Sequence, residues 1–195
     1  MFAEPSLTYL SPELLRVKER LDEFIDKEVI PAEKEYHDHI KIRKDDDRWS
    51  LDAIAPCLFR LQSRSKELGF WNMFLPPRLL RAPHWDSQIL DDELRPAIPG
   101  GGLTYREYGI LAESLGKSEF GSMVCNCSAP DTGNMEVLLE FGTQQQKRKY
   151  LKPLLQGKIR STFLMTEPGT NIYIVIICDV IVTFYAAVHR TAKHH

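Results

Sequence analysis

Two carboxylates, Glu136 and Glu140, have a spacing in this chain that could support acid–base chemistry. They are four residues apart, which places both on one face of a predicted helix, where a carboxylate can act as a general base. The same spacing is common among solvated charges on an amphipathic helix, and we favour that interpretation. The sequence therefore identifies no catalytic residue.

Four cysteines, at positions 57, 125, 127 and 178, are the other candidates for chemistry. Their spacing matches no common zinc pattern, and a single Cys-x-Cys pair is a weak signal. We interpret them as buried free thiols in a reducing compartment and predict no metal site.

The elements that would position any site are organised around the stretch from Gly142 to Pro168. Thr143 and Gln146 form a capping box that begins a helix, and three cations are expected on its exposed side: Lys147, Arg148 and Lys149. Pro153 suits the first position of a second short helix, and Gly157 suits a left-handed stop.

A strand follows this stop. Its side chains alternate between two faces. One face carries Ile159, Ser161, Phe163 and Met165, and the other carries Thr162, Leu164 and Thr166. Glu167 and Pro168 then end the strand.

Apolar residues at helical spacing predict further helices upstream. Ser11 caps a helix that Pro31 ends or kinks, and another helix runs from Pro56 to Gly69. A capping box of Thr104 and Glu107 begins a third helix, which stops at Gly116. Short helices are expected near Ser122 and after a cap at Asp131 or Thr132, which gives five or six helices in total.

Two segments between these helices have unusual compositions. Residues 70–75 crowd Phe70, Trp71, Met73, Phe74 and Leu75 together, and we interpret them as a core plug rather than a ligand surface. Residues 78–102 are rich in proline and glycine and are expected to form an irregular surface insertion.

The C-terminal residues 172–195 form a separate apolar tail. They contain a stretch of 17 largely apolar residues, which is short for a helix that spans a bilayer. Asp179 lies near the centre of this stretch, where a charged side chain makes insertion into the membrane costly. The β-branched residues favour a strand, although a membrane-associating helix and a disordered tail stay open. We expect this tail to lack a partner strand, so a strand formed here would be prone to aggregation.

Length and composition limit the class of protein. The chain has 195 residues, 43% hydrophobic residues and a net charge of −2, which suits one globular domain, or a domain plus a fragment. This net charge gives no reason to propose nucleic acid or an anionic membrane as a partner. Neither end carries a readable secretory, mitochondrial or peroxisomal signal.

Four segments follow one another along the chain, which are LTYREYGILAESLGKSEFG, NCSAPDTGNMEVL, FGTQQQKRKYLKPLLQGK and FLMTEPG. Together they resemble the acyl-CoA dehydrogenase family, and the second is similar to the branch with long, multidomain members. The resemblance covers most of residues 8–170. It implies a mainly α fold: an orthogonal helical bundle of the family's N-terminal type with a short β extension.

The resemblance divides the chain into three parts. Residues 8–157 would be the helical domain, residues 158–171 would be the start of the middle β domain, and residues 172–195 would be a divergent tail. Helical domains of this family pack against two others, so part of the Phe70–Leu75 segment would be exposed in this chain alone.

The resemblance also implies a cofactor and a reaction. Members of the family use FAD to introduce a double bond between the α and β carbons of an acyl-CoA thioester, in fatty acid β-oxidation. The strand ending in Thr-Glu-Pro runs along the flavin in this family, which implies four cofactor-binding residues here: Phe163, Leu164, Met165 and Thr166. A strand edge presents alternating amides and carbonyls, which suits a planar polar ring.

The pattern departs from the family at Ile172, which stands where a serine hydroxyl is expected. The family's catalytic glutamate belongs to a C-terminal domain that this chain does not contain, so we expect a truncated, inactive form. Two alternatives are a helical module that binds or competes with full-length dehydrogenase subunits, and a tail-anchored helical protein. A mitochondrial or peroxisomal location follows from the resemblance alone.

Overall fold

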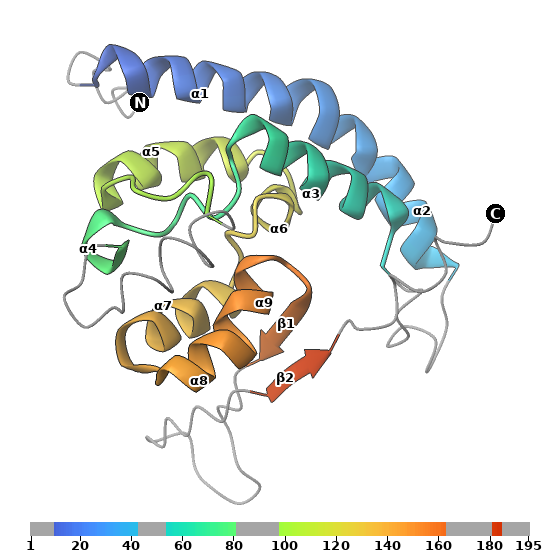
Figure 1. The fold of residues 1–195 in the computed structure, drawn as a ribbon. Helices are drawn as coiled ribbons and strands as arrows, with labels where there is room; N and C mark the ends of the chain where they lie inside the picture. The colour runs from blue at the N-terminus through green and yellow to red at the C-terminus, as the bar shows by residue number, and fades with distance from the viewer. Residues whose placement is uncertain (1–9, 43–53, 81–97, 163–180, 185–195) are drawn as a thin grey trace, which may run out of the picture.

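The computed structural model describes residues 10–42, 54–80, 98–162 and 181–184 (Figure 1). These residues are mainly helical and end in one pair of antiparallel strands, which confirms the predicted fold class. No helix among them is long and apolar enough to cross a membrane.

A long helical rod begins the described chain. Ser11 caps α1 (Pro12–Phe24) by accepting a hydrogen bond from the amide of Leu14 at 3.1 Å, as its sequence predicts. The rod continues through a π-helical turn (Ile25–Val29) and a 3-10 turn (Ile30–Ala32) into α2 (Glu33–Lys41). Pro31 therefore coincides with a change of helix type and not with a break in the rod.

The next helix is α3 (Pro56–Leu68), which ends at Gly69 in the left-handed conformation with φ of 81°. The Phe70–Leu75 segment follows and leads to the short α4 (Pro77–Leu80). All its large apolar side chains are 4% exposed or less, which confirms the core plug. The expectation that part of this segment would be exposed is wrong, because neighbouring segments of this chain already cover it.

The remaining helices are α5 (Tyr105–Leu115), α6 (Gly121–Val124), α7 (Asp131–Phe141), α8 (Gln144–Gln146) and α9 (Lys152–Leu155). A π-helical turn, Lys147–Leu151, joins the last two. Both predicted capping boxes are present: Thr104 with Glu107 at α5, and Thr143 with Gln146 at α8. Pro153 lies in the first turn of α9, and Gly157 takes φ of 70°, as expected for a left-handed stop.

Two residues of this region differ from the prediction. Lys147 was expected on the exposed side but is only 3% exposed, because it shares the inward side of the helix with Leu151 and Leu154. Asp131 was expected as a possible helix cap, but Pro130 occupies the cap position. The Asp131 side chain contacts the following strand instead.

Strand β1 (Ile159–Thr162) pairs antiparallel with β2 (Ile181–Phe184), with Ile159 opposite Phe184. Alternate β1 residues are buried, which confirms the predicted alternation over these four positions. The expectation that the tail has no partner strand is wrong for residues 181–184, because β1 is that partner.

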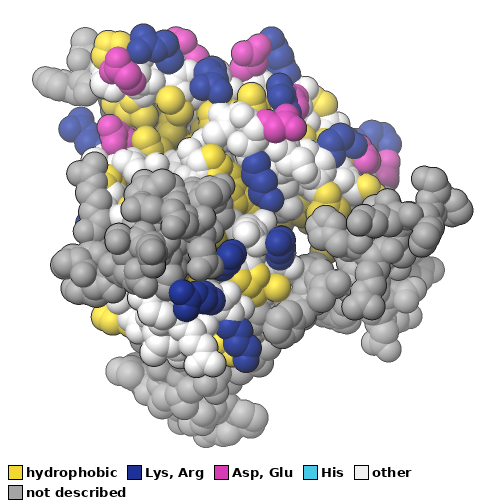
Figure 2. Space-filling model, viewed as in Figure 1, with side chains coloured by type: hydrophobic (Ala, Val, Ile, Leu, Met, Phe, Trp, Pro, Cys, Tyr) yellow, Lys and Arg dark blue, Asp and Glu magenta, His cyan; other side chains and the backbone are white. Residues whose placement is uncertain are grey.

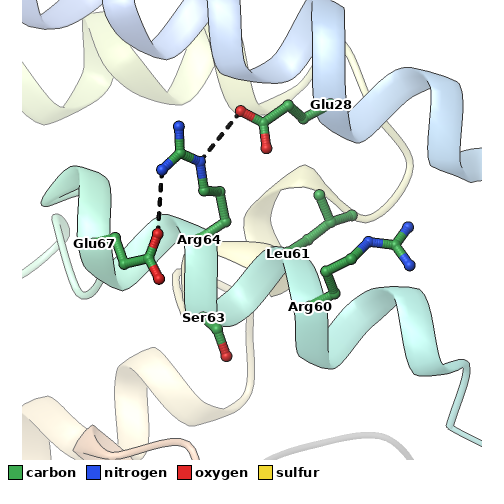
Figure 3. A pocket seen from close by; sticks show the side chains of 6 residues that line it. All are labelled: Glu28, Arg60, Leu61, Ser63, Arg64 and Glu67. Atoms are coloured by element: carbon green, nitrogen blue, oxygen red, sulfur yellow. Dashed lines mark hydrogen bonds and ion pairs between the residues drawn. The ribbon is translucent and has the colours of Figure 1, made fainter.

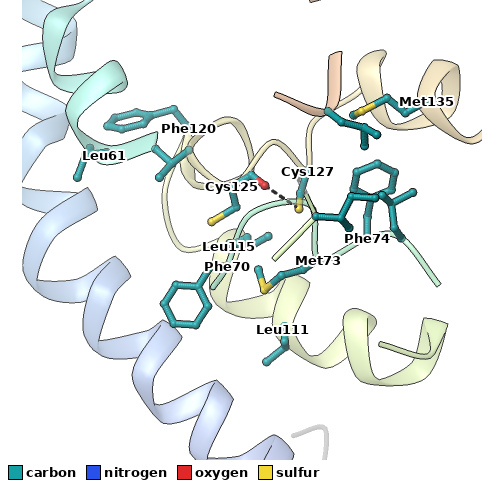
Figure 4. Close-up of a cluster of buried hydrophobic side chains, with 14 of the residues drawn as sticks. Leu61, Phe70, Met73, Phe74, Leu111, Leu115, Phe120, Cys125, Cys127 and Met135 are labelled. Carbon is teal, nitrogen blue, oxygen red and sulfur yellow. Dashed lines mark hydrogen bonds between the residues drawn. The ribbon is translucent and has the colours of Figure 1, made fainter. Parts of the chain in front are cut away.

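The core lies between α1, α3, the Phe70–Leu75 segment, α5 and the turn around residues 120–127 (Figure 4). Phe70, Phe120 and Leu111 are almost fully buried within it. Cys57, Cys125 and Cys127 are buried free thiols, as predicted, whereas Cys178 lies outside the described residues. Burial raises the pKa of the Cys127 thiol to about 11, so this thiol is neutral and poorly nucleophilic at neutral pH.

Candidate functional site

The start of β1 is fixed by a buried polar cluster at the first turn of α7. Asp131 Oδ1 accepts hydrogen bonds from the Ser161 amide and hydroxyl, both at 2.6 Å, and Asn134 Nδ2 donates to Ser161 Oγ at 2.8 Å. Arg160 Nε forms an ion pair with Asp131 Oδ2. Since Asp131 is 2% exposed and Asn134 is 1% exposed, the cluster is shielded from water and its hydrogen bonds are costly to lose.

The end of α9, just before β1, is held by a second cluster. The last carbonyls of a helix have no intrahelical partner, and here side chains provide one. Trp71 Nε1 and Asn72 Nδ2 donate to the carbonyl of Leu155 at 2.7 and 2.9 Å. Asn126 Nδ2 donates to the carbonyl of Leu154 at 3.1 Å and to Asn72 Oδ1 at 2.7 Å.

Two asparagines in this second cluster have left-handed backbones, Asn72 with φ of 62° and Asn126 with φ of 53°. Asparagine tolerates this conformation better than most residues with a side chain. The backbone geometry and the amide hydrogen bonds therefore require the same residue type at both positions.

Gly157 connects these two clusters through a close approach to the indole of Trp71. A Cβ atom at residue 157 would lie 2.7 Å from Trp71 Cζ2, and the φ of 70° is unfavourable for other residues. The chain therefore turns from α9 into β1 directly against the Trp71 ring. The cluster at the end of α9 holds the chain before Gly157, and the Asp131 cluster holds it after Gly157. Together they fix the direction in which β1 leaves the helical domain.

The four predicted cofactor-binding residues, Phe163 to Thr166, lie outside the described residues. They follow Thr162, the last residue of β1, and begin two residues after the Asp131–Ser161 contact. The structure therefore describes the anchored start of the predicted flavin strand, and the four contacts with FAD stay a prediction.

The two carboxylates singled out by spacing do not line a described cavity. Glu140 forms an ion pair with Arg78 at 3.6 Å, and Arg78 Nη2 also donates a hydrogen bond to the hydroxyl oxygen of Tyr105 at 2.9 Å. Burial raises the pKa of Glu136, while Arg78 acts in the opposite direction. This arrangement resembles a surface charge network and gives neither residue an assigned reaction.

A depression of about 490 Å³ lies between the helical rod and α3 (Figure 3). Arg64 of α3 reaches across it to Glu28 of the rod at 3.3 Å, and it pairs along its own helix with Glu67 at 3.1 Å. Its volume falls in the range of ligand sites, but it is open and polar, and these charges neutralise each other. No group of His, Cys, Asp and Glu in the described parts of the chain could hold a metal ion.

Sequence reasoning missed the role of Asp131 because an aspartate after a proline looks like a local helix cap. One signal was available: Ser161 is a polar residue on the inward face of the predicted strand. A buried hydroxyl requires a hydrogen-bonding partner, but the sequence does not show that the partner is 30 residues away.

Comparison with known proteins gives consistent matches. Residues 91–158 match the family model described as acyl-CoA dehydrogenase, N-terminal domain. The mouse protein acyl-CoA dehydrogenase family member 10 is 42% identical over 159 residues, which is 82% of this chain and 13% of the relative. Human acyl-CoA dehydrogenase family member 11 is 36% identical over 156 residues, 80% of this chain and 16% of the relative.

A solved structure of a Mycobacterium abscessus protein assigned to the acyl-CoA dehydrogenases has the same fold, with a TM-score of 0.63 and 36% identity. The match covers 83% of this chain and 36% of that protein, so the chain spans between 13% and 36% of these three relatives. The chain belongs to the acyl-CoA dehydrogenase family, of which it carries the N-terminal helical domain.

Proposed function

We propose that this chain provides the helical domain for FAD-dependent dehydrogenation of acyl-CoA thioesters in fatty acid β-oxidation, and that Phe163 to Thr166 form one edge of the flavin site. The observation that carries this proposal is the pair of 2.6 Å hydrogen bonds from Ser161 to Asp131. They fix the strand two residues before Phe163, where a flavin-binding edge needs a defined register.

FAD, when bound, would accept the β hydride of the acyl group. The chain's own contribution is to present the backbone amides and carbonyls of residues 163–166, together with the Thr166 hydroxyl, to the polar edge of the ring. Phe163, Leu164 and Met165 supply apolar surface next to these groups. No described carboxylate is assigned as the base for the α proton.

We expect the 195-residue chain to bind FAD weakly by itself. Association costs about 4 to 15 kcal/mol in lost translational and rotational freedom. A few backbone hydrogen bonds at about 1 kcal/mol each cannot offset this cost. Ile172 also lacks the hydroxyl that the family places near the pyrophosphate. We therefore propose that the isolated chain does not catalyse the oxidation of acyl-CoA.

Titration of FAD fluorescence with the full chain tests the proposed flavin edge. We expect quenching that riboflavin reverses by competition and AMP does not, because the edge contacts the ring and not the adenylate half. Thr166→Val should weaken quenching, whereas Thr132→Val, a matched change on α7, should not. Competition by AMP, or equal quenching in both variants, would contradict the proposal.

A second role, association with longer dehydrogenase subunits, is favoured by an exposed apolar pair on α7. Val137 is 52% exposed and Phe141, one turn later, is 76% exposed. Co-purification with a longer family member should be lost in Val137→Ser/Phe141→Ser. It should be retained in Ile42→Ser, a control at a residue that is 75% exposed on another helix end.

We also propose a mitochondrial or peroxisomal location, which the family resemblance supports. Imaging of the tagged full chain beside markers for both organelles tests it. A diffuse distribution that matches neither marker would contradict this proposal.

A further inference from the structure

The segment from Phe141 to Thr162 has an uneven charge distribution. It contains six basic residues and no acidic residue, the six being Lys147, Arg148, Lys149, Lys152, Lys158 and Arg160. The rest of the chain carries all 27 acidic residues and 19 of the 25 basic ones. The net charge of −2 therefore conceals a strongly basic region.

Half of these cations, Lys149, Lys152 and Lys158, gather with Lys66 on one surface. Lys149, Lys152 and Gln156 are three and four residues apart, so they share one side of the helical segment. Lys66 Nζ donates to the carbonyl of Gln156 at 2.9 Å, which brings the end of α3 to the same side. Burial lowers the pKa of Lys66, and the positive charge of Lys158 lowers it further.

Figure 2 shows Lys and Arg side chains extending from α3 over α9 and α8, with no Asp or Glu side chain visible among them. We call the surface formed by Lys66, Lys149, Lys152 and Lys158 the basic face. Lys149 and Lys158 are exposed to solvent.

Cations on the helical rod and at position 60 of α3 are paired with carboxylates. Lys27 pairs with Glu23 at 2.7 Å, and Arg60 pairs with Glu35 at 3.0 Å. On the basic face, Lys66 lies 4.1 Å from the centre of the Trp71 ring, and Lys149 lies 5.0 Å from that of Tyr150. These contacts orient the ammonium groups without neutralising their charge.

We propose that the basic face docks on an anionic phospholipid surface. Clusters of lysine on a protein surface are attracted to anionic lipid headgroups by long-range electrostatic forces that salt weakens. Lysine is depleted at protein–protein interfaces, where arginine and aromatic residues are enriched, so an acidic protein fits this face less well. The four side chains span the last turn of α3, the π-helical turn before α9, α9 itself and the residue before β1, so a broad, extended partner fits this face.

Sedimentation of the full chain with vesicles tests this proposal. We expect at least about tenfold stronger binding to phosphatidylcholine vesicles containing about 30% phosphatidylserine than to pure phosphatidylcholine. Raising the salt from about 50 to 300 mM should reduce this binding severalfold. Equal binding to both vesicle types, or no binding, would overturn the proposal.

Charge reversal locates the binding surface. Lys149→Glu/Lys158→Glu should reduce binding to the level of neutral vesicles, and Lys149→Gln/Lys158→Gln should reduce it in part. Lys27→Glu/Lys34→Glu changes the total charge equally but alters exposed residues of the helical rod, so it should retain the binding. Circular dichroism checks that each variant keeps the wild-type helix content.

Other partners would give distinct results that overturn the proposal. If vesicle binding persists in Lys149→Glu/Lys158→Glu and at high salt, it would result from insertion of the apolar residues 172–195 into the bilayer. Equal loss in the Lys27/Lys34 control would show a dependence on net charge alone. Competition by soluble polyglutamate or duplex DNA at least as strong as that by phosphatidylserine vesicles would assign the face to an acidic protein or a nucleic acid.

Discussion

Asp131 accepts two hydrogen bonds from Ser161, one from its backbone amide and one from its hydroxyl, both at 2.6 Å. One buried carboxylate at the start of α7 thereby fixes the backbone of β1. The contact joins the helical domain to the strand that leads into the predicted flavin edge. It lies just after the turn at Gly157, so the position and direction of the strand are set within five residues.

Loss of the Asp131 carboxylate should strongly destabilise the chain. We expect Asp131→Ala to lower the free energy of unfolding by about 3 kcal/mol, because the buried Ser161 amide loses its acceptor and Arg160 loses its ion pair. Urea denaturation measures this change. Asp38→Ala removes an exposed carboxylate and serves as the control, with an expected loss much smaller than that of Asp131→Ala. Equal losses in both variants would contradict the role of Asp131.

Two glycine substitutions separate backbone strain from steric clash. Gly157→Ala should cost about 3 kcal/mol, because its φ is 70° and the new methyl group would contact the Trp71 ring. Gly69 has φ of 81° but open space around it, so Gly69→Ala should cost only about 1 kcal/mol. Thermal denaturation of both variants gives the comparison. A Gly157→Ala loss no larger than that of Gly69→Ala would show that the indole moves freely.

The amide of Asn126 supports the end of α9, and its removal should destabilise that end. Asn126→Ala loses hydrogen bonds to Asn72 and Leu154 and places alanine at φ of 53°, for an expected cost of about 3 kcal/mol. Asn126→Gly loses the same bonds without the backbone strain and should recover about 1 kcal/mol. If both variants unfold at the same urea concentration, the left-handed backbone contributes nothing.

The Asp22 ion pairs predict a stability change at acidic pH. Burial alone would raise the pKa of Asp22, but hydrogen bonds from Lys117 and Lys18 outweigh it and lower the pKa from 3.8 to about 2. The folded-state pKa is depressed, so the stabilisation is present above pH 4 and is lost as the pH falls from 4 to 2. After discounting for partial exposure, we expect about 1 kcal/mol.

The difference in unfolding free energy between the wild type and Asp22→Asn isolates this contribution. It should be constant at pH 5 to 7 and should shrink towards pH 2, as measured by urea denaturation at each pH. A difference that grows on acidification would reverse the sign of the proposed linkage.

Local features of the fold could be predicted from sequence. The caps at Ser11, Thr104 and Thr143 and the stop at Gly157 depend on neighbouring residues, and the structure contains all four. The alternation of β1 was also readable, because a strand with one buried face has a period of two.

Features that depend on tertiary contacts could not be predicted in the same way. The burial of Lys147 follows from its alignment with Leu151 and Leu154 across a π-helical turn that the sequence did not reveal. Asp131 looked like a cap because its real partner, Ser161, is 30 residues away. The pairing of β1 with residues 181–184 is likewise nonlocal. The flavin-binding edge at Phe163–Thr166 is therefore predicted from family resemblance. The structure describes the strand that leads to it only as far as Thr162.

The flavin content of the purified 195-residue chain tests the central claim most directly. If this chain provides the helical domain and only one edge of an FAD site, its visible absorbance spectrum after incubation with FAD and gel filtration should show far less than one flavin per chain. The titrations described above should still detect weak, riboflavin-sensitive binding. A yellow protein that keeps one FAD per chain through gel filtration would contradict the account, because these residues would then complete the site alone.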